Sequence, residues 1–303
     1  MGGPPPGRST WCNASVWATK AEARFRAVLG FCTDSGAQLP PELIERYGLA
    51  VVPLTVTLDG VEHREGVDLG ADDFWDRFAR PPAPTVHTAA PPPGRFLEAW
   101  GDLAARGVTE IVSIHTGSDV SSTLDAARIA AEMAPVPVHL VDSHTASFAV
   151  GCCTWEAAEA AERGVPVDEV VRIAEAVAGR VSNVFVVRAL DLVRAGGRLR
   201  PGTDEEGSIP VLSLTDGKVQ PIGRAASVEE ACDQMAAFVL ALGEGLRVGL
   251  SIADRAAAPV WEALEARLAG QPQVRELVRY RVGPSIGAHT GPGTAGAVAY
   301  PTG

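Results

Sequence analysis

The sequence predicts an α/β protein, because apolar runs of strand length alternate with amphipathic stretches of helix length. Strand-like runs at 27–32, 108–115 and 136–141 end in small polar residues, and a helical stretch follows them. Two Asp-Gly pairs, at 59–60 and 216–217, follow further apolar runs and predict tight hairpins. Parallel strands joined through helices and antiparallel hairpins are therefore expected in the same chain.

The length and composition support a globular protein with a substantial core. The chain has 303 residues, enough for two ordinary domains, and 46% of them are hydrophobic. The formal net charge of −11 argues against nucleic acid or an anionic membrane surface as partner, since both need a basic surface. We find no apolar stretch near the roughly 18 residues that span a bilayer and no N-terminal signal core, so we expect a cytoplasmic protein.

The cysteines and lysines restrict the chemistry further. Five cysteines, an odd number without metal-like spacing, predict free thiols and no metal site. Lysine occurs only as Lys20 and Lys218, and no G-x-x-x-x-G-K-[ST] motif is present. We therefore expect neither ATP binding through a P-loop nor Schiff-base catalysis.

Residues 1–26 are rich in proline and glycine and are predicted to form a disordered extension, followed by an N-terminal domain at 27–180. The first strand of this domain is followed by Thr33, Asp34 and Ser35. These residues suit either a turn with a helix cap or a ligand site at the carboxyl end of a strand.

Two later segments of this domain place hydroxyl groups beside predicted helices. Thr88 lies in a proline-rich segment that precedes a helix with an early Phe96. The strand at 108–115 runs into a polar loop with Ser118 and Ser121, and a helix begins at Leu124. Free N–H groups and the helix dipole at such a helix start attract an anion, although serine is equally typical of a simple N-cap.

A C-terminal domain is expected over 181–303, with a hairpin at Asp216-Gly217 and alternating strands and helices after it. It includes the segment 283–296, which holds five glycines, three hydroxyl groups and one histidine, His289. We interpret this segment as a glycine-dense loop that feeds a short strand and lets the backbone approach a ligand closely. His289 is then its polar anchor.

Two short motifs in this segment have weak support. Residues 291–296 match G-x-G-x-x-G, but that motif binds a dinucleotide only between a strand and a helix, with an acidic residue about 20 positions further on. Residues 283–287 match the G-x-S-x-G nucleophile elbow around Ser285, which needs an acid and then a histidine downstream. Only His289 follows, four residues away in the same segment.

Several motifs, in the right order from about Val28 onward, resemble the DegV family of fatty-acid-binding proteins. The segment 283–296 resembles the family's G-P-V-I-G-x-H-T-G-P-G-x-x-G, and residues 33–35 match its T-D-S. Thr88 matches the threonine of T-S-Q-P-S, and Ser121 matches the serine of S-G-T in the loop S-S-x-L-S-G-T.

The chain departs from these motifs at a few positions. Ser285 stands where a valine is usual, and Ser122 replaces the glycine of S-G-T. Ala89 and Ala90 replace the usual Ser-Gln, which removes a hydroxyl and an amide from the surroundings of Thr88. The resemblance therefore leaves the polar details of the site open.

The resemblance implies two α/β domains with a ligand between them, the first built on a mainly parallel sheet and the second on a mixed sheet with helices. It implies a lipid-binding protein, not an enzyme, which presents the carboxylate of a long-chain fatty acid to a separate ATP-dependent fatty-acid kinase. No cofactor is expected, and the membrane is expected to be touched only transiently, for ligand exchange. Arg198, from a motif like L-x-x-L-x-K-G-G-R-I, and Arg224 are expected to contact the kinase.

The polar residues at strand ends and helix starts suit this ligand, since neutral donors can hold a carboxylate or phosphate without covalent chemistry. The predicted carboxylate-binding residues are Thr88, Ser118, Ser121, His289 and Thr290, with Thr33, Asp34, Ser35 and Gly287 near the site.

Two rival functions remain open at this stage. A serine-dependent ester hydrolase would use Ser121 or Ser285 with His289, although no acid is evidently placed to orient the histidine. A sensor of a small anionic metabolite would use the same fold without a long cavity for an acyl chain.

Overall fold

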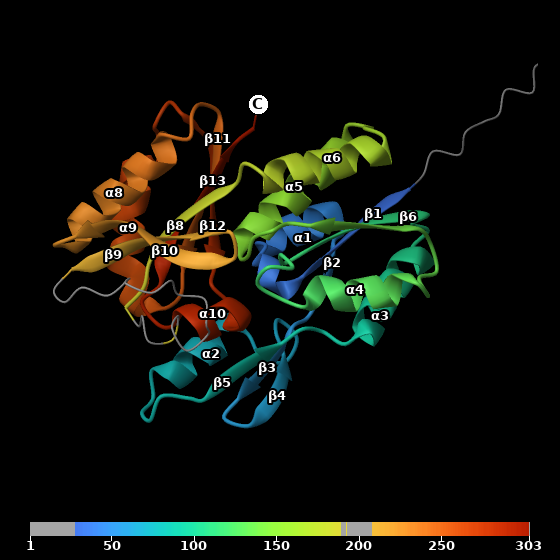
Figure 1. The fold of residues 1–303 in the computed structure, drawn as a ribbon, viewed down its shortest axis with the longest axis horizontal. Coiled ribbons are helices and arrows are strands. Elements are labelled where there is room, and N and C mark those ends of the chain that lie inside the picture. Colours follow the sequence, from blue (N-terminus) through green and yellow to red (C-terminus); the bar gives the residue numbers. More distant parts are fainter. Residues whose placement is uncertain (1–27, 189–191, 193–207, 303) are drawn as a thin grey trace, which may run out of the picture.

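The computed structural model describes residues 28–188, 192 and 208–302, and it confirms the α/β class (Figure 1). Three sheets are present: a four-stranded parallel sheet, a six-stranded mixed sheet and a three-stranded antiparallel sheet. The predicted extension at 1–26 lies outside the described residues.

The parallel sheet has the strand order β2-β1-β6-β7 and belongs to the first half of the chain. Its strands are β1 (Leu29–Asp34), β2 (Ala50–Val52), β6 (Glu110–His115) and β7 (Val138–Asp142). The central strands are apolar on both faces, because helices cover both sides of the sheet.

One face of this sheet packs against α3 and α4, and the other packs against α5, α6 and α1 (Figure 1). These helices are α1 (Pro41–Tyr47), α3 (Pro93–Ala105), α4 (Thr123–Ala131), α5 (Phe148–Glu162) and α6 (Val167–Ala178). A 3-10 turn, η1 (Ser35–Ala37), follows β1 directly.

The mixed sheet has the order β10-β9-β8-β13-β11-β12. Its strands are β8 (Ser182–Val186), β9 (Ile209–Thr215), β10 (Lys218–Ala225), β11 (Leu246–Ile252), β12 (Val274–Arg281) and β13 (Ala295–Pro301). Helices α8 (Val228–Leu240) and α9 (Ala258–Leu268), the latter preceded by the turn η2 (Arg255–Ala257), cover one face.

Both predicted hairpins form. Asp59 and Gly60 join β3 (Thr55–Leu58) to β4 (Val61–Arg64) with φ angles of 51° and 83°. Asp216 and Gly217 join β9 to β10 with φ angles of 50° and 68°. Positive φ at both central residues is the geometry for which Asp-Gly is selected in two-residue turns.

The small antiparallel sheet, in the order β4-β3-β5, was not expected as a separate unit. It consists of β3 (Thr55–Leu58), β4 (Val61–Arg64) and β5 (Val86–Ala89), and α2 (Ala71–Phe78) packs on it. The apolar run at 50–58 is split at Pro53, so that its first part, β2, joins the parallel sheet and only β3 enters the hairpin. Proline lacks the N–H that a continuous ladder would need.

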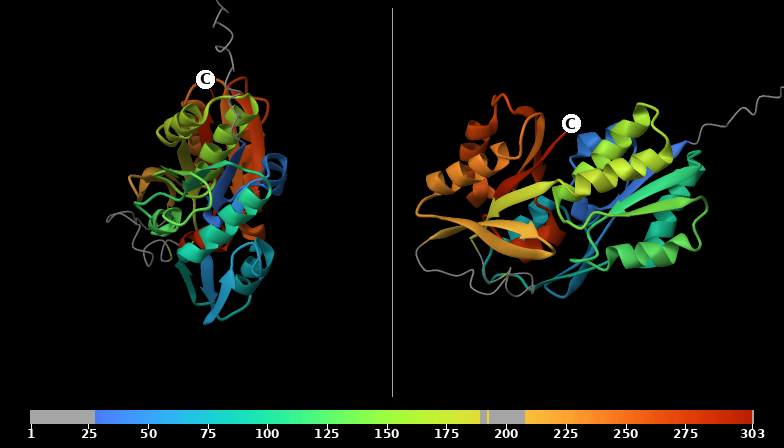
Figure 2. Two further views of the ribbon diagram at one scale, coloured as in Figure 1. Left: turned by 90° about the vertical axis from the view of Figure 1, so that its right-hand side faces the viewer. Right: turned by 45° about the horizontal axis from the view of Figure 1, so that its top comes forward.

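Helix α5 lies between the parallel sheet and the mixed sheet (Figures 1 and 2). Of its 15 residues, 12 are buried, including Phe148, Gly151 and Trp155. Small residues allow close packing on both sides: an added Cβ at Gly151 would lie 2.8 Å from the carbonyl oxygen of Ala37. Phe148, the first residue of α5, stacks on Tyr280 of β12 in the mixed sheet, with ring centroids 4.8 Å apart. The two halves of the chain therefore share one core.

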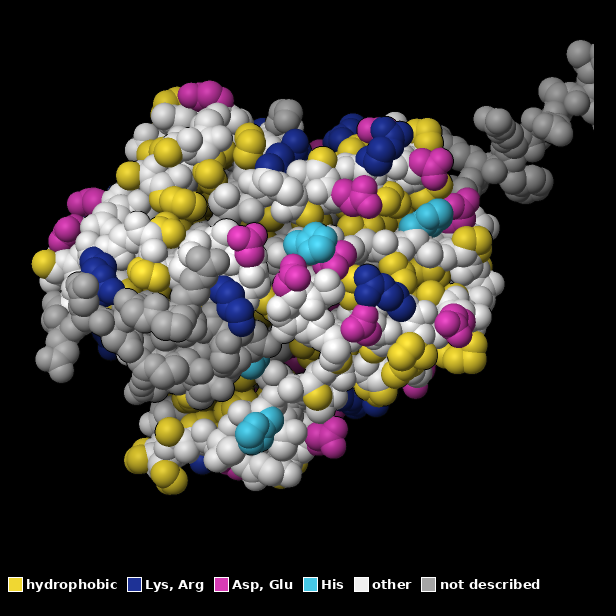
Figure 3. Space-filling view, viewed as in Figure 1, with side chains coloured by type: hydrophobic (Ala, Val, Ile, Leu, Met, Phe, Trp, Pro, Cys, Tyr) yellow, Lys and Arg dark blue, Asp and Glu magenta, His cyan; other side chains and the backbone are white. Residues whose placement is uncertain are grey.

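The described surface mixes both signs of charge, and Figure 3 shows acidic and basic side chains interspersed on the face drawn. Within the described residues, the structure contains no helix that could cross a membrane and no group of metal-ligating side chains.

We expect Gly249→Ala to lower the free energy of unfolding by about 1–3 kcal/mol, because the new methyl group overpacks the core. An added Cβ on Gly249 would lie 2.5 Å from Cε1 of Phe148, which is held against Tyr280. Chemical denaturation followed by circular dichroism measures the effect. Gly101→Ala in α3 is the control: nothing lies within 4 Å of its added Cβ, and alanine is the better helix former. Equal stability of the two variants would contradict this packing.

Candidate ligand-binding site

A cavity of about 480 Å³ lies where the three sheets meet. This volume is within the range of about 300–1,000 Å³ that is usual for small-molecule sites. Its walls include loops at the carboxyl ends of β1 and β6, the end of β5, the inner face of the mixed sheet, and α10 (Pro284–Thr290). The site therefore lies beyond the carboxyl ends of parallel strands, as expected for an open α/β sheet.

Most of the cavity wall is apolar. The inner face of the mixed sheet and the neighbouring elements contribute Leu54, Val184, Phe185, Val219, Ile286 and Val298. Tyr280 also lines the wall, and burial raises the pKa of its hydroxyl to about 12, so this group stays protonated at neutral pH.

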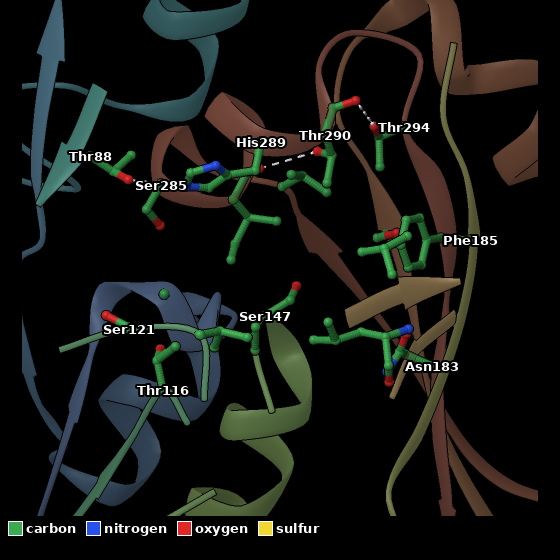
Figure 4. Close-up of a pocket in the computed structure, with 18 of the residues that line it drawn as sticks. Thr88, Thr116, Ser121, Ser147, Asn183, Phe185, Ser285, His289, Thr290 and Thr294 are labelled. Carbon is green, nitrogen blue, oxygen red and sulfur yellow. Dashed lines mark hydrogen bonds between the residues drawn. The ribbon is translucent and has the colours of Figure 1, made fainter. Parts of the chain in front are cut away.

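Polar residues line the cavity from several elements, and Thr88, Ser285 and His289 come together on one side of it (Figure 4). Thr88 on β5 and His289 on α10 point toward each other, and the Thr88 Oγ1 and His289 Nε2 atoms are 3.0 Å apart. Both residues are partly exposed. Two of the predicted binding residues, 201 positions apart in the chain, therefore share a hydrogen bond.

The prediction of a glycine-dense loop at 283–296 was wrong for its first half, where α10 forms. Gly283 is the N-cap and Pro284 is the first helical residue, where its missing N–H costs nothing. Gly287 allows α10 to lie on α2: an added Cβ there would be 2.7 Å from both Phe74 and Trp75. The helix thereby carries His289 to the cavity.

A buried carboxylate, Glu65, holds the start of α10. Its Oε1 accepts a hydrogen bond from the backbone N–H of Ser285 (2.9 Å), and its Oε2 accepts one from the hydroxyl of Ser35 (2.5 Å). Gln38 donates to the same carboxylate (3.3 Å) and accepts from the N–H of Gly283. Ser35, predicted near the site, therefore acts through this network; Glu65 and Gln38 were missed, because nothing in their local sequence marks them.

Asp34, the neighbour of Ser35 in the chain, forms a second buried network of hydrogen bonds. Its carboxylate accepts from the N–H of Gly36 (3.0 Å) and from both the N–H (2.9 Å) and the hydroxyl (2.8 Å) of Thr116. Gly36 and Thr116 line the cavity, but Asp34 does not. The predicted Asp34 therefore shapes the wall from behind, and the buried Thr33 beside it also lies outside the lining.

The two predicted serines of the 116–123 loop lie in different places. Ser121 lines the cavity, and its hydroxyl lies 2.8 Å from that of Thr123. Ser118 does not line the cavity; its hydroxyl donates to Asp142 (2.5 Å). Thr290 lines the cavity but donates back to the carbonyl of Ile286 (3.3 Å), one turn earlier in α10.

Ser147 lines the cavity at the start of α5 and was also missed. Its backbone has φ 60° and ψ −153°, a conformation whose strain is about 1–3 kcal/mol for a residue other than glycine. No sequence signal marks such a position. Arg224 lies on β10 and does not line the cavity, so the structure gives it no contact with a ligand there. The predicted Arg198 lies outside the described residues.

The geometry gives the hydrolase alternative no support. The hydroxyl of Ser121 bonds to Thr123, and the buried hydroxyl of Ser285 has no hydrogen-bond partner, so neither serine is bonded to His289. A Ser–His–Asp chain of hydrogen bonds does exist elsewhere: the His115 ring lies 2.7 Å from the hydroxyl of Ser113 and 3.1 Å from the Asp34 carboxylate. All three of its side chains are fully buried and no substrate can reach them.

Comparison with known proteins identifies the family and agrees with this fold. Residues 29–302 match the family model described as an uncharacterised protein of the DegV family, and the chain belongs to this family. A DegV domain-containing protein of Streptomyces coelicolor is 36% identical over 271 residues, which are 88% of this chain and 96% of that protein. The resemblance seen in the sequence motifs is therefore confirmed.

Two solved structures of the family have the same fold. One is a fatty-acid-binding DegV protein from Thermus thermophilus, with a TM-score of 0.79, 29% identity, and coverage of 90% of this chain and 99% of that one. The other is DegV, a fatty-acid-binding protein from Bacillus subtilis, with a TM-score of 0.80, 23% identity, and coverage of 90% and 99%.

We expect the raised pKa of Glu65 to make the protein less stable as the pH rises. Burial raises this pKa above its usual 4.5, although the hydrogen bonds from Ser35 and Ser285 oppose the shift. Below about pH 4.5 the carboxyl is protonated in both states and has no net effect; above it, only the unfolded state ionises freely, so unfolding becomes easier until the folded pKa is passed.

The measurement is the free energy of unfolding of the wild type minus that of Glu65→Gln, which cannot titrate, as a function of pH. This difference should fall as the pH rises from about 4.5 and then level off. A difference for Glu65 that stays flat or rises would contradict the assigned pKa shift.

Proposed function

We propose that the protein binds a long-chain fatty acid in this cavity and presents its carboxylate to a separate ATP-dependent fatty-acid kinase. The observation that carries the proposal is a cavity with a mostly apolar wall on which Thr88 and His289 form a hydrogen-bonded polar pair. The fatty-acid binding of the Thermus thermophilus relative, at 29% identity, supports the choice of ligand.

The polar groups of the cavity suit a carboxylate. Thr88, His289 and Ser121 present hydroxyl and imidazole groups, and no acidic side chain lines the cavity among the described residues. Such donors hold an anion through charge-assisted hydrogen bonds without reacting with it. In this proposal the Thr88–His289 pair opens or shifts to donate to the carboxylate, and Ser121 approaches it from the opposite wall.

The apolar wall suits an acyl chain. Each buried methylene group contributes about 0.8 kcal/mol, so roughly fourteen contribute about 11 kcal/mol before the cost of ordering the chain. The wall is built on strands of the mixed sheet and on α10, elements that are fixed by the shared core. A small-anion sensor has no use for this apolar area, and this favours the fatty acid over that alternative.

In the proposed reaction the kinase transfers the γ-phosphoryl group of ATP to a carboxylate oxygen, which yields an acyl phosphate and ADP. This chain then needs no nucleotide site of its own, and it acts as the substrate-presenting partner. The partial exposure of Thr88 and His289 leaves the headgroup within reach of a second protein. Arg198 and Arg224 are the proposed contacts of that protein.

We expect His289→Ala to weaken the binding of palmitate by about tenfold or more, the loss expected for a hydrogen bond to a charged group. Native mass spectrometry and a fluorescent fatty-acid displacement titration measure the occupancy and the dissociation constant. His87→Ala is the matched control, since His87 is exposed on the same strand as Thr88 but does not line the cavity. Unchanged affinity in the His289 variant would refute its role, and an empty wild-type protein that refuses palmitate and oleate would refute the function.

We expect Arg224→Ala to slow acyl-phosphate formation by the partner kinase severalfold while leaving the fatty-acid affinity unchanged, because the residue lies outside the cavity. Arg128→Ala, on α4, is the control for the loss of one exposed arginine. A normal rate of acyl-phosphate formation with the Arg224 variant would refute the proposed contact between Arg224 and the kinase.

A further inference from the structure

One polar side chain of the cavity makes no hydrogen bond of normal length. The Ser285 side chain lines the cavity and is only 3% exposed, and the acceptor near its hydroxyl is the buried Glu65 carboxylate, whose pKa it helps to lower. A buried hydroxyl without a full hydrogen bond destabilises the protein unless something that binds to it compensates. Because Ser285 lines a cavity, the missing partner can be a ligand.

The other buried or partly buried hydroxyls of the wall are already engaged. Thr116 donates to Asp34 (2.8 Å), and Thr294 donates to the carbonyl of Gly291 (2.8 Å). Ser251, which is also 3% exposed, donates to the carbonyl of Gly296 (3.3 Å). Among the described lining residues, Ser285 is therefore the buried hydroxyl that is left to bind a ligand atom.

The position of Ser285 identifies the kind of ligand atom. Ser285 and His289 are four residues apart in α10, so their side chains lie on the same face of the helix, one turn from each other. Figure 4 shows the Ser285 hydroxyl pointing into the space between the Thr88–His289 pair and the groups of Ser121 and Thr116. This is the side of the cavity where Thr88, Ser285 and His289 come together and where the headgroup of an acyl ligand belongs.

We propose that the Ser285 hydroxyl donates a hydrogen bond to the carboxylate of the bound fatty acid and thereby favours acids over neutral lipids of the same chain length. The inference rests on the proposed function and deepens it. A carboxylate has two oxygens that accept several hydrogen bonds, so it can bind Ser285 together with His289. The backbone of Ser285 is held by Glu65, which fixes the start of the helix and limits where the hydroxyl can point.

The test compares wild type, Ser285→Ala and Ser285→Val for the dissociation constants of palmitic acid and of hexadecanol, which has the same chain length and a neutral headgroup. We expect Ser285→Ala to weaken the binding of palmitic acid about tenfold and that of hexadecanol about threefold or less. The reason is that a hydrogen bond to a charged acceptor is roughly twice as strong as one between neutral groups. Ser118→Ala is the matched control: its hydroxyl donates to Asp142 and the residue does not line the cavity, so the ratio of the two affinities should stay at the wild-type value.

Each other outcome overturns a different statement. If the wild type binds palmitic acid and both Ser285 variants bind it equally well, the role of Ser285 is refuted and the proposed function stands. If the affinities of the variants for palmitic acid and for hexadecanol fall by the same factor, Ser285 shapes the cavity and does not bind the carboxylate. If the wild type binds neither lipid, the proposed function itself fails.

Discussion

The burial of α5 between two sheets is the constraint on which the rest of the structure depends. A helix with 12 of 15 residues buried must be covered on nearly all sides, and the parallel sheet, α6 and the mixed sheet provide that cover. Small residues such as Gly151 and Cys152 let both sheets approach closely. Two halves of a chain joined in this way form a single core, and the space that remains beside α5, where Ser147 lies, becomes the cavity.

The cavity is built by elements that are distant in the sequence and meet only because of this core. Its polar pair, Thr88 and His289, combines β5 and α10, and the buried Glu65 links α10 to the turn after β1. Two buried carboxylates thus support the site, Glu65 at the start of α10 and Asp34 behind Thr116. Neither carboxylate faces the cavity, so the groups that do are neutral donors, a property that suits a bound anion.

Much of the fold could be predicted from local pattern. Apolar runs with polar ends predicted three of the four strands of the parallel sheet, β1, β6 and β7, and the Asp-Gly pairs predicted both hairpins. The predictions failed where a glycine or a proline was compatible with two different local structures. The glycines of 283–296 predicted a loop, but Pro284 at the first helical position and the room created by Gly287 allow α10. Pro53 ended a strand that the apolar pattern alone continued.

The sequence by itself determined which residue types could form a site. Thr88 lies near the end of β5 and Ser121 just before α4, positions that follow from hydrophobic periodicity, whereas His289 was expected in a loop and lies in the last turn of α10. Only the tertiary structure decided which of them meet. Thr88 and His289 are in contact, whereas Ser118 turns to Asp142, and the unpaired hydroxyl of Ser285 faces the cavity. The reason is physical: hydrogen-bond partners far apart in the chain are chosen by the packing of whole elements, which no local pattern encodes.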